Sequence, residues 1–419
     1  MAEMITTADA QYAYDIVSTI CTEVGPGLPA SPQERERAAV IKKELESHLG
    51  AGNVAVEEFT CAPGAILSPY PGVLLMLLAV LLNISTGRFS GVSPWLTTIP
   101  ALVFSILSPA LFLFEFLLGY ELIDPLVKKN QSVNVIGTLR RPGAGPVKRL
   151  LILSGHHDSA AELTWLRLLG YGFFFFSAIY FLGFIVMLVA SIVQLAGVIA
   201  GSAATVRFGT LGWPLLVCPI VPALIYALFV FRGKKGGGVV PGAVDNLSAS
   251  ALAVAACRFL VNNPTYIPAD TEIRFISFGS EEVGVRGSRR YVRRHLDELK
   301  HLDARLLNVE MVAHPEIGIL TSDQNGFVKS SPAMVTSVVA AAQRAGVPHK
   351  LRSAGIGTGT DAVPFIRAGL RAVTLFPFKF PQQTVAFYHQ KWDRPEVLTI
   401  EPLLNVLKLT LEWVRSGGE

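Results

Sequence analysis

Two adjacent glutamates, Glu281 and Glu282, come directly after an apolar segment that begins at Thr271 and reads as a β-strand. Because side chains alternate along an extended chain, the two carboxylates should point in different directions from one corner of the fold. One of them could then hold a metal ion while the other acts on a water molecule. An isolated pair of acids is most often a solvated loop, since acidic residues are mostly exposed. The interpretation therefore depends on partners elsewhere in the chain.

Further side chains of this kind follow other predicted strands. Residues 149–154 form a nearly continuous apolar strand, typical of a buried α/β sheet, that leads into the motif GHHDS. Residues 306–310 form another strand, which ends in a glutamate. Open α/β sheets place their sites beyond the carboxyl ends of the strands, so we expect these side chains to meet. The candidates at such ends, or in the loops after them, are His156, Asp158, Asp245, Glu281, Glu282, Glu310 and His389.

The candidates have the donor chemistry of a zinc centre with two ions. Histidine nitrogens and carboxylate oxygens suit zinc, and a carboxylate can bridge two ions about 3.5–4 Å apart. The chain contains no HExxH, GxSxG or Walker motif, which removes the main support for a zincin, a serine hydrolase or a P-loop protein. Its four cysteines are scattered and indicate neither a disulfide framework nor a thiolate zinc site. The segment GIGTGTD lacks the last glycine of a dinucleotide fingerprint, because Thr360 stands there, and is interpreted as a turn-rich loop.

The elements that position these residues alternate between strands and helices. Residues 30–50 predict an amphipathic surface helix, since Ser31 and Glu34 have the spacing of a capping box and Gly50 stops the run. Further strands are expected at residues 54–59, 132–139 and 371–376. The alternation predicts a three-layer α/β domain with a mixed, mostly parallel sheet.

The composition predicts that much of the chain lies in lipid. Of its 419 residues, 51% are hydrophobic and only 16% are charged, and the mean hydropathy is positive. Four apolar runs reach the roughly 20 residues needed to cross a bilayer core, and they lie at 64–84, 96–118, 168–200 and 211–231. They pair into two transmembrane α-helical hairpins, residues 64–119 and 167–232, which interrupt one soluble domain made of residues 1–63, 120–166 and 233–419.

Each hairpin returns the chain to the side that it left, so the soluble parts can assemble on one face of the membrane. Positive residues near the ends of spans are retained in the cytoplasm. The far loops carry only Arg88 and Arg207, whereas the flanks on the domain side carry Lys128, Lys129, Arg167, Arg232, Lys234 and Lys235. We therefore expect an integral membrane protein with four transmembrane helices and a cytoplasmic soluble domain.

Other features narrow the partners. The net charge of +4 comes without a long basic run, which argues against nucleic acid. The N-terminus carries acids and no apolar core, which predicts no signal peptide. Glu115 lies inside the second apolar run, where a charge is costly, and two interpretations stay open. It lies near the interface or is protonated against a neighbour, or it serves transport.

The order of the motifs resembles the zinc-dependent aminopeptidase family that includes bacterial leucyl aminopeptidases, glutamate carboxypeptidase II and glutaminyl cyclases. The motifs are GHHDS, GAVDNLSAS, SEEVGVRGS, NVEMV and a late Tyr388-His389. The segments EVGPGLPASPQERERAA and TDAVPFIRAG are also similar to that family. The resemblance covers the soluble parts and leaves out the hairpins, and it implies a zinc-peptidase fold.

The resemblance implies a role for each ligand. Asp245 would bridge two zinc ions, His156 and Glu310 would complete the shell of one ion, and Glu282 and His389 that of the other. The family usually has aspartate where this chain has Glu310, which leaves open whether one metal or two are bound.

The resemblance also implies how the site works. Glu281 would be the general base, and Asp158 would orient His156 or shape the turn. A whole hairpin separates Asp158 from Asp245, where the family has about a dozen residues. This departure suggests a substrate that is associated with the membrane.

These observations predict a membrane-integral zinc metallo-aminopeptidase that acts on peptides. Glutaminyl cyclisation or dipeptide hydrolysis on the same site, and a non-catalytic receptor-like adaptor, are the alternatives. His156, which the cyclases of the family lack, favours hydrolysis, and the complete ligand set argues against an adaptor. The oligomeric state and the preferred side chain stay open.

Overall fold

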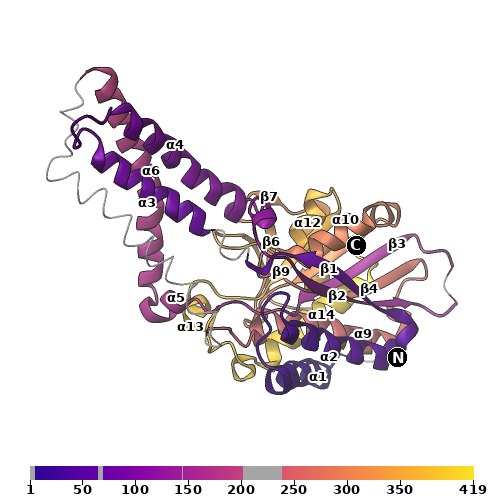
Figure 1. Ribbon diagram of the computed structural model, residues 1–419. Coiled ribbons are helices and arrows are strands. Elements are labelled where there is room, and N and C mark those ends of the chain that lie inside the picture. Colours follow the sequence, from indigo (N-terminus) through magenta and orange to yellow (C-terminus); the bar gives the residue numbers. More distant parts are fainter. Residues whose placement is uncertain (1–4, 65–68, 144, 202–237) are drawn as a thin grey trace. The chain divides into compact units, whose positions relative to one another are not determined.

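The computed structural model describes residues 5–64, 69–143, 145–201 and 238–419. These residues divide into two compact units (Figure 1). The first, which we call the sheet unit, draws on Met1–Pro63, Leu126–Glu162 and Gly238–Glu419. The second, the helical unit, draws on Gly64–Pro125 and Leu163–Gly237. The sheet unit is thus built from three separate stretches of the sequence.

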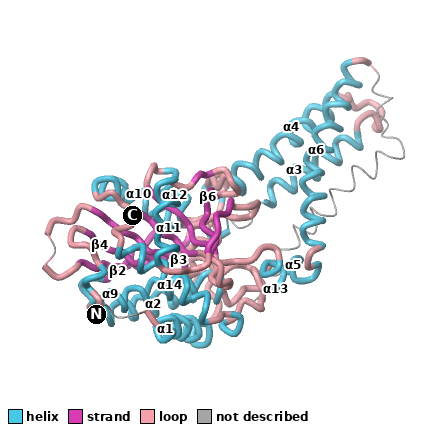
Figure 2. The backbone as a smooth tube through the Cα atoms, turned by 180° about the vertical axis from the view of Figure 1, so that it is seen from behind, coloured by secondary structure: helices cyan, strands magenta, loops and turns pink. Residues whose placement is uncertain are grey.

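A sheet of nine strands forms the centre of the sheet unit (Figure 2). Its order is β1-β2-β4-β3-β5-β9-β6-β7, with β8 paired to β6. The strands are β1 Val54–Cys61, β2 Asn130–Arg140, β3 Arg149–His156, β4 Thr271–Phe278, β5 Arg305–Val309, β6 Ile317–Asp323, β7 Val328–Lys329, β8 His349–Ser353 and β9 Arg371–Phe376.

The sheet is mixed as predicted, but the expectation that it is mostly parallel is wrong. Strands β4, β3, β5 and β9 form a parallel centre. The pairs β1/β2, β2/β4, β6/β9 and β6/β7 are antiparallel, so only half of the eight pairings are parallel. Strand direction at the edges depends on long-range pairing, which apolar runs along the sequence do not specify. The parallel centre is the part that carries three of the predicted site segments at its carboxyl ends.

Alternating side chains of β3 face two separate cores. Leu151 and Leu153 belong to the core that the sheet shares with five helices, while Leu150 and Ile152 face the core on the other side. This alternation gives the three layers that were predicted. The first face is covered by α1 Thr7–Thr19, α2 Pro32–Leu49, α9 Ser248–Asn262, α11 Pro332–Arg344 and α14 Ile400–Arg415, and the second by α10 Arg286–His301 and α12 Ala362–Arg367.

Helix α2 has the predicted ends but not the predicted setting. Ser31 accepts a hydrogen bond from the N–H of Glu34 at 3.1 Å, and Gly50 ends the helix with a φ of 78°. The side chains of Glu34 and Arg37 are fully buried, so α2 is not simply a surface helix. Both charges turn inward, toward loops of the sheet unit, where backbone groups bind them.

The helical unit contains α3 Pro69–Ser85, α4 Trp95–Leu111 with a π-helical extension Phe112–Leu117, α5 Thr164–Leu169 and α6 Gly172–Ile199. Within the described residues, three helices are long and apolar enough to cross a membrane: Trp95–Leu117, Gly172–Ile199 and Ala243–Asn262. The third contains α9 and is 89% buried by packing in the sheet unit, so protein rather than lipid covers it. The predicted run 211–231 lies outside the described residues, and α3 is shorter than the three.

Polar contacts join α3, α4 and α6 of the helical unit. Asn83 donates to the hydroxyl of Ser191 at 2.9 Å, and this hydroxyl lies 2.8 Å from that of Ser105. The carboxylate of Glu115 accepts the backbone N–H of Leu122 at 2.7 Å. Glu115 is therefore bound to the chain that follows its own helix, which favours the first of its two interpretations over transport.

We expect the substitution Gly155→Ala to destabilise the sheet unit. A Cβ at this position would lie 2.4 Å from the Cβ of Ala249 and 2.8 Å from the backbone nitrogen of Ser250. Because α9 and β3 would have to separate, the free energy of unfolding should fall by about 2 kcal/mol or more. The control is Gly52→Ala, where a Cβ meets nothing within 4 Å. Thermal unfolding in detergent measures both, and equal melting temperatures would contradict the packing described.

Candidate metal centre

The structure brings all seven candidate residues to the carboxyl end of the parallel strands. His156 ends β3, Asp158 follows it, and Glu310 comes directly after β5. Glu281 and Glu282 lie in the turn after β4. Asp245 precedes α9, and His389 lies in the loop after α13 Gln382–Ala386. Three groups could hold a metal ion: His156 with Asp245 and Glu310, Asp245 with Glu282 and His389, and His156 with Glu281 and Glu282.

The two oxygens of Asp245 face different histidines. Its Oδ1 lies 3.4 Å from Nε2 of His156, which is itself 3.3 Å from Oε1 of Glu310. Its Oδ2 lies 3.0 Å from Nε2 of His389, which is 3.3 Å from Oε2 of Glu282. This is the arrangement expected of a carboxylate that lies between two ions.

The charges of these groups are out of balance without a cation. Burial raises the pKa of Glu281 well above its usual value and that of Glu310 to about 8. Burial would lower the pKa of both histidines, yet the Glu310 carboxylate raises that of His156, and Glu282 and Asp245 raise that of His389 to about 10. Burial itself raises the pKa of the two glutamates, and the neighbouring carboxylates raise that of the two histidines.

Several buried polar atoms of the centre lack partners. Among the described residues, no hydrogen bond reaches Nε2 of His156, Oε1 of Glu282 or Oε2 of Glu310. Buried polar atoms are nearly always paired. Together with the nitrogen and oxygen donor set, these atoms fit metal ions of the zinc type, which would both bind the atoms and offset the negative charge.

Asp158 contacts both glutamates and His156. Its two oxygens accept the backbone N–H groups of Glu281 and Glu282, each at 3.0 Å, and Oδ1 also lies 3.2 Å from Nδ1 of His156. Although burial raises the pKa of Asp158, the hydrogen bond with His156 lowers it overall. The two functions expected of Asp158, orienting His156 and shaping the turn, are compatible in this geometry.

Two further carboxylates hold the backbone of the site in the same way. Asp393 accepts the N–H groups of Val244 at 2.7 Å and Asp245 at 3.1 Å. Glu34 accepts the N–H of Ser280 at 2.7 Å and its hydroxyl at 2.8 Å. Neither residue is expected at the site from the sequence, because the spacing of Glu34 fits a helix cap and Asp393 lies in a loop without a predicted strand. The sequence signal that points to Asp393 is its position four residues after the candidate ligand His389.

Arg37 joins two segments of the site that are far apart in the sequence. Its guanidinium donates to the carbonyls of Gly25 at 2.8 Å, His157 at 3.2 Å and Pro241 at 2.6 Å. Burial lowers the pKa of Arg37 to about 10. Because this value is still well above neutral pH, the group stays charged. Asp361 is another buried residue that is not among the seven candidates. It is fully buried in the loop interpreted as a turn, and burial raises its pKa to about 7.

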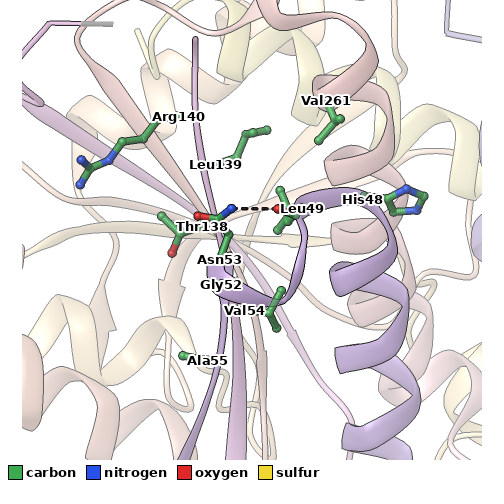
Figure 3. A pocket seen from close by; sticks show the side chains of 10 residues that line it. All are labelled: His48, Leu49, Gly52, Asn53, Val54, Ala55, Thr138, Leu139, Arg140 and Val261. Carbon is green, nitrogen blue, oxygen red and sulfur yellow. Dashed lines mark hydrogen bonds between the residues drawn. The ribbon is translucent and has the colours of Figure 1, made fainter. Parts of the chain in front are cut away.

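A cavity of about 550 Å³ lies elsewhere in the sheet unit (Figure 3). It is lined by residues from the end of α2, the start of β1 and the end of β2, among them His48, Val54 and Arg140. Arg140 is paired with Glu272 at the start of β4, whereas the candidate glutamates follow the end of that strand. The cavity is therefore at the opposite edge of the sheet and shares no residue with the candidate metal centre.

Comparison with known proteins bears on the same residues. Peptidase family M28 matches residues 231–414, which include five of the seven candidates, and His156 and Asp158 precede this region. The aminopeptidase YwaD of Bacillus subtilis (strain 168) is 30% identical over 182 residues, 42% of this chain and 34% of that protein. The resemblance to the zinc aminopeptidases is confirmed. The matched region spans about a third of the length of YwaD.

Solved structures of M28-like proteins share the fold. The zinc aminopeptidase BSAP from Bacillus subtilis has a TM-score of 0.55 at 16% identity, covering 99% of this chain and 96% of that one. The glutaminyl cyclase of Fimbriiglobus ruber has a TM-score of 0.55 at 13% identity, with the same coverage. At these identities the likeness shows the fold alone, and it does so for peptidases and cyclases equally.

We expect each group of candidate ligands to bind its own metal ion, so that removing a ligand of one group removes one ion. The purified protein should retain about two zinc ions per chain after dialysis, measured by mass spectrometry of the metal. His389→Ala should lower this to about one, because it removes a ligand of only one group, and Asp245→Ala should remove most of both. The exposed His301 offers the control His301→Ala, which should change nothing. A His389→Ala protein that keeps two ions would contradict the assignment of His389.

Proposed function

We propose that this protein is a membrane-integral zinc metallo-aminopeptidase that removes N-terminal residues from peptides. The observation that carries the proposal is the position of Asp245 between two ligand groups, with Glu281 beside them. His156 and Glu310 would hold one ion and Glu282 and His389 the other, with Asp245 shared. The M28 match and the similarity to an aminopeptidase support a hydrolase of peptide bonds.

The residues of this chain would divide the chemistry between them. When bound, zinc supplies a Lewis acid that polarises a carbonyl and makes water acidic enough to react near neutral pH. Glu281 lies 3.6 Å from Nε2 of His156 through its Oε2, so its carboxylate borders the first ligand group. It would take the proton from the attacking water and pass it to the leaving amine. Burial raises the pKa of Glu281, which suits a group that must both accept and release a proton.

The membrane part of the proposal rests on the helical unit. The helices Trp95–Leu117 and Gly172–Ile199 have the length and composition of spans, and we assign two further spans to residues 64–84 and 211–231. We keep the division into residues 1–63, 120–166 and 233–419 for the catalytic domain and 64–119 and 167–232 for the hairpins. The excess of Lys and Arg on the domain side supports a cytoplasmic catalytic domain.

The substitution Glu281→Gln should abolish most of the turnover and leave metal binding intact. The amide cannot take up a proton, so kcat on a panel of fluorogenic aminoacyl substrates should fall by about 10²–10⁴-fold. Glu401→Gln, at an exposed glutamate, is the matched control. Turnover close to that of the control would rule out Glu281 as the base. Adding a peptide with N-terminal glutamine to the panel separates hydrolysis from cyclisation.

The substitution Glu34→Ala should lower activity only by displacing the turn that carries Glu281. Without its carboxylate, the N–H of Ser280 loses its acceptor and the turn that carries Glu281 is free to shift. We expect kcat to fall about tenfold, with KM and zinc content little changed, because a misplaced group costs catalysis more than binding. Glu36→Ala, at an exposed glutamate of the same helix, is the control. A loss of zinc together with activity would instead indicate general damage to the site.

A further inference from the structure

For the second of its two insertions, Leu163–Gly237, the chain leaves and re-enters the sheet unit through one narrow connection. The N–H of Val240 donates to the carbonyl of Ala160 at 3.1 Å, and the N–H of Glu162 donates to that of Gly238 at 2.6 Å. Between these bonds, Ala161 and Val239 form an antiparallel bridge. We call residues 160–162 and 238–240 the neck. All residues between its two strands belong to the helical unit.

The neck is joined directly to the candidate metal centre. Glu162 comes four residues after Asp158, and Val240 comes five residues before Asp245. Arg37 binds the carbonyls on both sides, those of His157 and Pro241. The path from the neck to the ligands is therefore short and held by hydrogen bonds.

The number of residues between Asp158 and α6 sets an upper limit on the distance from the candidate metal centre to the start of α6, the first long apolar helix of this insertion. Five residues lie between Asp158 and α5, α5 has six residues, and two more lie between α5 and Gly172, where α6 begins. At about 3.6 Å per extended residue and 1.5 Å per helical residue, this path covers at most about 40 Å. This limit holds for every arrangement of the two units.

The loops around His389 expose side chains of the kind that contact membrane surfaces. Phe380 is 61% exposed and Trp392 is 47% exposed, and Nζ of Lys391 lies 4.4 Å from the centre of the Trp392 ring. Exposed Lys379, Lys391 and Arg394 add positive charge to the same segment. Aromatic side chains beside cations are typical of the interface between lipid and water, where the cations attract anionic headgroups.

This segment lies beside the candidate metal centre. The N–H of Ala313, three residues after Glu310, donates to the carbonyl of Pro377 at 2.9 Å. The side chain of Gln383 donates to the carbonyl of Ala313 at 2.8 Å. The segment that carries Phe380 is therefore bonded to the loop that follows Glu310, and Trp392 comes three residues after His389. We call Lys379, Phe380, Lys391, Trp392 and Arg394 the rim.

We propose that the rim contacts the surface of the bilayer that the helical unit enters, and that the substrates are peptides anchored in that bilayer. The inference rests on the proposed function, because it needs both a peptidase site and membrane integration. A peptide on a short stem from the same bilayer would reach the centre at a high effective concentration, which a free peptide lacks. An extended stem of about 12 residues spans the 40 Å limit.

The test uses the full protein in liposomes that contain anionic lipid. The substrates carry one fluorogenic N-terminal residue on stems of 2 to 20 residues, either attached to an acyl chain or free. We expect the anchored forms to be cleaved at least tenfold faster than the free forms at equal bulk concentration, with the rate levelling off at stems of about 12 residues or fewer. Equal rates for anchored and free forms would overturn the proposal.

A variant of the rim separates this inference from the proposed function. Phe380→Ser combined with Trp392→Ser should lower the rate on anchored substrates at least fivefold and leave kcat/KM on a soluble aminoacyl amide within twofold. Leu351→Ser, at an apolar side chain that is 56% exposed on β8, is the matched control. An unchanged rate on anchored substrates in the double variant would overturn the role of the rim. Lack of activity of the wild type on every soluble and anchored substrate would instead contradict the peptidase assignment.

Discussion

A surplus of negative charge in a small buried volume is the constraint on which the rest of the sheet unit depends. Asp245, Glu282 and Glu310 are almost fully withdrawn from water, and each has a carboxylate oxygen within 3.3 Å of a nitrogen of His156 or His389. Carboxylates in such a place are either protonated or compensated by cations. The folded chain keeps them together because other interactions hold their backbones. The crowding of carboxylates that makes this assembly costly is therefore also the feature that would favour a divalent ion there.

The interactions that hold those backbones share one design. Asp158, Asp393 and Glu34 each accept backbone N–H groups from a turn that carries a ligand or the proposed base. The pKa of Asp158 is lowered, so this carboxylate stays charged and binds an N–H more strongly than a neutral acceptor would. A carboxylate that accepts two adjacent N–H groups also fixes the direction of the peptide chain between them. The ligand carboxylates are thus aimed by a second set of carboxylates, and the buried cation of Arg37 lies among them.

The sequence predicted that the seven candidates lie close together, which the structure shows, but it did not predict the residues that hold their backbones. Five of the seven candidates end or follow β3, β4 or β5, and the carboxyl ends of parallel strands meet in space whatever the loops do. Glu34 was assigned to a helix cap, a function that local spacing explains equally well, and its burial depends on contact with Ser280, which is 246 residues away. Strand directions at the sheet edges escaped prediction for the same reason. The length and composition of Ala243–Asn262 are those of a membrane span, and tertiary packing alone decides that protein buries it.

The neck lies where a long insertion disturbs the site least, because the two ends of the insertion are held together there. Loop-closure entropy rises only slowly with length, so a long insertion is tolerated where its two ends are held together. Between Asp158 and Asp245 the ends are held by the bridge of Ala161 with Val239 and by Arg37. The ligands on either side can then keep their places whatever the inserted residues do. The short stretch from Asp158 to Gly172 also sets an upper limit on the distance between the candidate centre and the start of the first apolar helix of the insertion. The proposed contact of the rim with the bilayer relies on this covalent limit and on no particular arrangement of the two units.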